Sequence, residues 1–133
     1  MNEKMSAATN ALNWFEISVK DISRAKKFYE SIFEITMEEM DMMGMKYAMF
    51  PFDPTKGKIG GGLAQSQMHT PGTTGSVVYL NANPDVQNVL DKIESAGGKI
   101  IVPKTEISPE YGHMAVFIDT EGNRVALHSI PKQ

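Results

Sequence analysis

The same order of predicted elements occurs twice along this chain of 133 residues, and this duplication restricts the fold more than any other feature. Each half, of roughly 60 residues, predicts a strand, a helix and then three strands, although few letters are identical between the halves. A four-stranded sheet with one helix has one face left uncovered, and two such modules facing each other can bury or enclose that face. We therefore expect an α+β domain of two βαβββ modules, residues 11–68 and 74–130, that form a barrel-like cleft. Residues 1–10 predict a flexible tail.

Apolar periodicity supports the same element order in both halves. Residues 14–19 alternate as a strand, with Trp14, Glu16 and Ser18 on the face opposite the apolar one. Residues 22–33 and 86–96 repeat apolar side chains at steps of three and four, which predicts two amphipathic helices, and Asp21 can cap the first. Further strands are predicted within residues 35–52 around a turn near Gly44, at residues 60–64 and 77–80, at residues 99–102 closed by Pro103, and at residues 114–118 and 124–128.

Composition excludes several classes of protein and site. The chain has 13 basic and 16 acidic residues, a formal charge of -3, so no basic face is forced and nucleic acid is not an expected partner. Cysteine is absent, which excludes disulfides, zinc–cysteine sites, iron–sulfur clusters and a thiol nucleophile. No apolar run approaches the ~18 residues of a membrane span, and the first ten residues lack the apolar core of a signal peptide. We expect a soluble, cytoplasmic protein with no membrane partner.

Three stretches resemble the vicinal oxygen chelate superfamily, which includes glyoxalase I, bleomycin-resistance proteins, fosfomycin-resistance enzymes and extradiol dioxygenases. They are Trp14-Phe15-Glu16-Ile17-Ser18-Val19-Lys20-Asp21 with Arg24-Ala25 and Phe28-Tyr29, then Gly97-Gly98-Lys99, and finally residues 117–125, which are similar to a terminal D-P-E-G-N hairpin with Thr120 in place of proline. The ending Ala126-Leu127-His128-Ser129 resembles a glyoxalase-like branch whose chemistry is mostly unassigned. The resemblance covers residues 11–130 and implies paired βαβββ modules and, often, a homodimer.

The resemblance also implies a metal held by four residues, one from the first and one from the last strand of each module. Those positions fall on Trp14, within residues 62–65, on Val77 or Val78, and on Ala126. Tryptophan, valine and alanine cannot ligate a metal through their side chains, and within residues 62–65 only Gln65 could. We therefore expect no standard metal tetrad, no cofactor and no conventional glyoxalase I site, with a divalent metal at a displaced site left as an alternative.

Candidate site residues follow from the same strands. Glu16 and His128 each lie two residues from a ligand position and so share its face. They are candidates for an acid–base pair or for displaced metal ligands, and the plainer alternative is that they hydrogen-bond to neighbouring strands or to each other. Candidate ligand contacts in the cleft are Trp14, Tyr79, Val77, Leu63, Ala126 and His113.

Three other features have a plain interpretation beside a functional one. His69 stands in a loop between the modules with no visible partner, and we expect it to be solvated. The triple glycine at residues 60–62 predicts a bulge or close backbone packing rather than a phosphate-binding loop. The methionine-rich stretch at residues 37–49 predicts core plus a tolerant hairpin, or else a deformable pocket wall or dimer surface.

Three functions remain open at this point. The first is a lyase or isomerase that uses Glu16 and His128 on a small oxygen-rich molecule, as the resemblance implies. The second is a module that binds a small amphipathic or aromatic molecule in the cleft between the sheets, as resistance proteins of the superfamily do without a catalytic metal. The third is a degenerate domain for protein association. We favour the second, because the expected cleft is apolar and aromatic.

Overall fold

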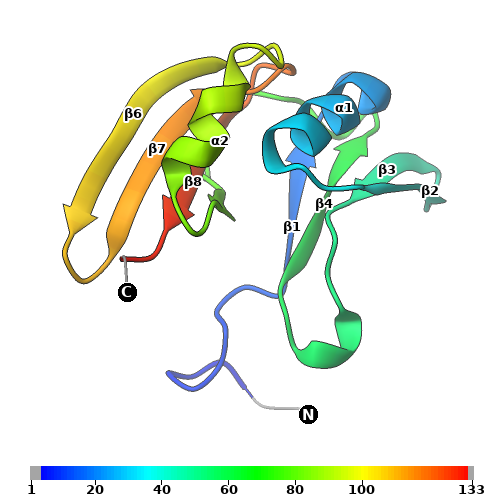
Figure 1. Ribbon diagram of the computed structural model, residues 1–133. Helices are drawn as coiled ribbons and strands as arrows, with labels where there is room; N and C mark the ends of the chain where they lie inside the picture. Colours follow the sequence, from blue (N-terminus) through cyan, green and yellow to red (C-terminus); the bar gives the residue numbers. More distant parts are fainter. Residues whose placement is uncertain (1–3, 132–133) are drawn as a thin grey trace.

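The computed structural model describes residues 4–131, without the side chain of Met42, and it confirms the two modules in the expected order (Figure 1). The expected tail lies partly outside these residues, and residues 4–13 form turns and bends. The first module contains β1 (Trp14–Ser18), α1 (Ile22–Phe33), β2 (Glu38–Met42), β3 (Met45–Met49), the short 3-10 turn η1 (Pro54–Lys56) and β4 (Gly60–Gln65). The second contains β5 (Tyr79–Asn81), α2 (Val86–Ile93), β6 (Lys99–Ser108), β7 (Gly112–Ile118) and β8 (Arg124–Ser129).

The two sheets have the same strand order. The order is β1-β4-β3-β2 in the first sheet and β5-β8-β7-β6 in the second. In each sheet the strand that comes first in the sequence pairs in parallel with the strand that comes last, β1 with β4 and β5 with β8. β1 and β5 are thus both edge strands, and within the described residues no ladder of hydrogen bonds joins one sheet to the other. The α+β fold class is confirmed, while the two sheets stay separate and do not close into a barrel (Figure 1).

The core lies where the two helices and the inner faces of both sheets meet. Asp21 caps α1 by accepting a hydrogen bond from the backbone N–H of Arg24 (3.1 Å), as predicted. The buried face of α1 reaches the second module, since the rings of Phe28 and Tyr29 lie 5.9 and 6.4 Å from that of Phe117 on β7. One hydrophobic cluster therefore contains residues of both modules and fixes them against each other.

The strands β5 and β6 differ most from the predicted strand bounds, while the other strands begin or end within two residues of them. Pro103 was expected to close a strand at residues 99–102, but β6 continues to Ser108. β6 is an edge strand, and its pairing with β7 shifts register between Val102 and Thr105, so the missing proline N–H costs the sheet little. β5 begins at Tyr79 rather than Val77. Neither α1 nor α2, the α-helices of the described part, is long and apolar enough to cross a membrane.

Candidate functional site

A cleft of about 900 Å³ lies beside the edge strands of the two sheets. Trp14 and Glu16 line it from β1, and residues 76–81 line it from the second module. The remaining lining residues come from the chain before β1 and from the segment between β3 and β4: Leu12, Pro51, Phe52, Lys58 and Ile59, with Phe15 of β1. Phe15 and Leu80 also line a second cavity of about 430 Å³. Because these residues come from both modules, the cleft depends on how the modules are packed together.

Aromatic rings cover the triple glycine at the start of β4, and two of these rings, Phe15 and Phe52, also line the cleft. An added Cβ at Gly60 would lie 2.7 Å from ring atoms of Phe52, one at Gly61 would lie 2.3 Å from Phe15, and one at Gly62 would lie 2.3 Å from Tyr47. The Phe52 ring in turn packs edge-on against Trp14, with centroids 5.2 Å apart and planes at 70°. Of the two predictions for residues 60–62, close packing is therefore the one seen.

The residues at the four metal positions of the resembled superfamily do not fit a metal. The indole N–H of Trp14 donates to Tyr47 (2.7 Å), and Gly60, opposite Trp14 in the β1–β4 register, is covered by Phe52. The Gln65 carbonyl oxygen accepts from the backbone N–H of Ile22 (2.8 Å), so it caps α1 instead of joining Trp14. Val77, Val78 and Ala126 offer only hydrocarbon. No group of three or more metal-ligating side chains of His, Cys, Asp or Glu occurs in the part of the chain that the structure describes.

Glu16 is the centre of a polar network on the first sheet. The Tyr47 hydroxyl donates to Glu16 Oε2 (3.0 Å), while Nε2 of His69 lies 2.8 Å from Glu16 Oε1. Burial raises the pKa of Tyr47 to about 12, and the adjacent Glu16 carboxylate acts in the same direction, against the hydrogen bond from Trp14. Tyr47 therefore remains a neutral hydrogen-bond donor near neutral pH and holds the carboxylate at the wall of the cleft.

The prediction for His69 was wrong, because its side chain is only 17% exposed and contacts Glu16. The structure does not pair Glu16 with His128. Nε2 of His128 lies 2.6 Å from the backbone oxygen of Tyr111, so His128 links the end of β8 to the β6–β7 turn. The signal for the Glu16–His69 contact is not local, since 53 residues separate the partners and the loop after β4 must fold back over the sheet to bring them together.

The other predicted contact residues divide into two groups. Trp14, Val77 and Tyr79 line the cleft, and Tyr79 is 55% exposed there. Leu63 is fully buried in the core and does not reach the cleft, because it lies on the face of β4 that packs against the helices. Ala126 is fully buried opposite Tyr79, and His113 is half-buried on β7; neither is among the residues that line the cleft.

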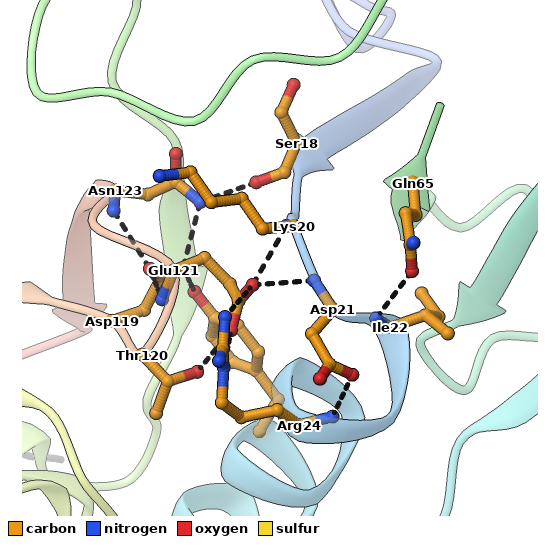
Figure 2. Close-up of polar contacts among 11 residues, drawn as sticks. Ser18, Lys20, Asp21, Ile22, Arg24, Gln65, Asp119, Thr120, Glu121 and Asn123 are labelled. Carbon is orange, nitrogen blue, oxygen red and sulfur yellow. Dashed lines mark hydrogen bonds and ion pairs between the residues drawn. The ribbon is translucent and has the colours of Figure 1, made fainter. Parts of the chain in front are cut away.

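The D-T-E-G-N hairpin, residues 119–123, joins the two modules (Figure 2). The Glu121 carboxylate accepts the backbone N–H groups of Lys20 (2.8 Å) and Asp21 (2.9 Å) and pairs with Arg24 (2.7 Å) at the start of α1. Asn123 donates to the backbone oxygen of Ser18 (2.7 Å). Burial favours a higher pKa for Glu121, but the hydrogen bonds from Arg24 and the two amides outweigh it and lower that pKa. The resemblance singled out this motif, and in the structure the motif holds the two modules of the chain together.

Solved structures of known proteins share this fold. A hypothetical protein from S. aureus aligns with a TM-score of 0.64 and 17% identity over 92% of this chain and 95% of that one. A genomically encoded fosfomycin resistance protein from Listeria monocytogenes aligns with a TM-score of 0.61 and 16% identity over 100% and 95%. A glyoxalase I mutant from Zea mays gives 0.66 and 21% over 88% of this chain, which spans only 46% of that one.

A comparison with curated proteins finds no match. A comparison with protein families matches residues 11–127 to the Glyoxalase/Bleomycin resistance protein/Dioxygenase superfamily, over both modules. The resemblance seen in the opening and closing stretches is thereby confirmed, and the chain belongs to this superfamily.

Proposed function

We propose that the cleft beside β1 and β5 binds a small amphipathic or aromatic molecule. The observation that carries the proposal is the lining at the former metal positions, where Trp14, Val77 and Val78 present apolar surface to a cleft of about 900 Å³. Sites for small molecules are typically concave, mostly apolar and about 300–1,000 Å³ in volume. The cleft has both the size and the surface that such a ligand needs.

The polar groups of the cleft are few, and each could orient a ligand. Lys58, Ser76 and Asn81 lie at its wall, and Glu16 is 37% exposed there. Glu16 accepts one hydrogen bond at each oxygen, and a carboxylate oxygen can accept a second. A flat ligand would thus stack against the rings of Trp14 and Tyr79 while its polar end meets one of these groups.

Trp14, the single tryptophan of the chain, allows a direct test. Titration with a library of aromatic and amphipathic compounds should change its fluorescence and saturate. A ligand at 100 times its Kd should also stabilise the fold by about 2.7 kcal/mol in a thermal melt. Tyr79→Ala should weaken binding by about tenfold, while Tyr111→Ala, at a 67% exposed tyrosine outside the cleft, should leave it unchanged. A broad library without a saturating compound would argue against the proposal.

The metal content of the protein distinguishes the binding function from the lyase or isomerase alternative. Protein purified without a histidine tag and then dialysed against zinc and nickel should retain no stoichiometric metal in elemental analysis, because the family positions offer no ligating set. A bound metal that disappears in Glu16→Gln or His128→Ala would instead support that alternative. The homodimer implied by the resemblance, and protein association as the third function, stay predictions that sedimentation can test.

A further inference from the structure

Three side chains of the first module form a continuous chain of hydrogen bonds that the proposed binding function does not require. Oγ of Ser66 lies 2.7 Å from Nδ1 of His69, and Nε2 of His69 lies 2.8 Å from Oε1 of Glu16. Both distances are in the range of well-formed hydrogen bonds. A hydroxyl, an imidazole and a carboxylate in this order are the groups that activate a serine as a nucleophile.

The surrounding contacts determine where the protons lie. The ionised Glu16 carboxylate only accepts, so Nε2 of a neutral His69 carries the proton and Nδ1 is left as an acceptor. An unprotonated Nδ1 can only accept, so the Ser66 hydroxyl donates to it, while Ser66 Oγ accepts from the backbone N–H of Met68 (3.1 Å). His69 is therefore placed to remove the proton of Ser66, with Glu16 stabilising the imidazolium that results.

Further hydrogen bonds fix both ends of this chain of three side chains. Ser66 and His69 belong to one turn after β4, closed by the His69 N–H to Ser66 carbonyl hydrogen bond (3.2 Å). Glu16 is fixed by the Tyr47 hydroxyl, which itself accepts from the indole of Trp14. Orientation of a reacting group by its supporting contacts is what a catalytic serine needs and a solvated surface serine lacks.

We propose that Ser66, His69 and Glu16 form a catalytic triad that hydrolyses small activated carboxylic esters. Ser66 Oγ attacks the carbonyl carbon as its proton passes to Nδ1 of His69. The bond from the carbonyl carbon to the leaving oxygen breaks, the alcohol or phenol departs with that proton, and the acyl group stays on Ser66. Water then attacks this ester, again with proton transfer through His69, and releases the carboxylic acid and the free serine. In a chymotrypsin-like triad Nε2 of the histidine contacts the serine and Nδ1 contacts the carboxylate. Here Nδ1 contacts Ser66 and Nε2 contacts Glu16.

The test uses p-nitrophenyl acetate and the full chain. Wild-type protein should release p-nitrophenol, and mass spectrometry should locate an acetyl group on Ser66. Ser66→Ala and His69→Asn should each lower the rate about 100-fold or more, and Ser31→Ala, at an exposed serine of α1, should not change it. Circular dichroism checks that each variant is folded. A Ser66→Ala variant that hydrolyses the ester at the wild-type rate, or acetyl groups on lysines alone, would overturn the proposal.

A cysteine substitution gives a second readout that does not need turnover. The natural chain has no cysteine, so Ser66→Cys and Ser31→Cys each introduce a single thiol. Beside His69 the thiol of Ser66→Cys should react with iodoacetamide about tenfold faster at neutral pH than that of Ser31→Cys, because the imidazole stabilises the thiolate. Adding His69→Asn should remove the difference. Equal rates in the two cysteine variants would contradict activation by His69, and neither readout depends on a ligand in the cleft.

Discussion

Gly61→Ala is expected to lower the free energy of unfolding by about 2 kcal/mol, a typical cost of overpacking. The added Cβ would lie 2.3 Å from ring atoms of Phe15, and a real side chain does not approach this closely. Phe15 is partly buried and packs against the hydrophobic core, so its ring must turn toward the cleft and give up that packing to make room for the methyl group. Urea denaturation of the variant, followed by circular dichroism, measures the loss as a lower midpoint at unchanged slope.

Gly72→Ala is the matched control. An added Cβ at Gly72 meets no atom within 4 Å, so this variant should be neutral or more stable by about 0.5 kcal/mol, through the less flexible unfolded chain. In a Phe15→Ala background the cost of Gly61→Ala should largely disappear, since the clashing ring is gone. Should Gly61→Ala cost as much without the ring as with it, close packing would not be the reason for this glycine.

The glycines show how far local sequence patterns reach. Apolar residues at a period of two predicted most of the strands, and apolar residues at a period of 3.6 predicted both helices. Both patterns depend only on residues that are close in the sequence. The run of three glycines predicted close packing without saying what packs there. Phe15 lies on β1, while Tyr47 lies on β3 and Phe52 in the loop that follows β3, and only the folded sheet brings these rings onto the glycines.

The candidate site was predictable to the same degree. Alternation along β1 put Trp14 and Glu16 on one face, and both line the cleft. The partner of Glu16 was predicted by analogy between the modules as His128, whereas the structure supplies His69 from a loop. Loop conformation follows from tertiary contacts rather than from periodicity, so a histidine without a strand or helix pattern carried no signal of its partner.

Glu121→Gln is expected to destabilise the fold by about 3 kcal/mol at neutral pH, because one carboxylate oxygen becomes an amide N–H₂ that faces donors instead of accepting from them. The Glu121 side chain is fully buried and accepts from Arg24 and from the amides that connect β1 to α1. The variant therefore weakens the contact between the modules as well as the start of α1. Thermal and urea unfolding measure the loss, with Glu110→Gln, at an exposed carboxylate, as the control.

The pH dependence gives this prediction its sharpest form. Folding lowers the pKa of Glu121 from its ordinary value of 4.5, so the unfolded chain binds the proton more readily than the folded one. The stabilisation by Glu121 is thus fully present above pH 4.5 and is lost as the pH falls through the lower pKa of the folded state. The difference in stability between wild type and Glu121→Gln should narrow between about pH 5 and pH 3, while Glu110→Gln follows the wild type throughout. A difference that stays constant over this range would mean that the ionised carboxylate is not what joins the hairpin to α1.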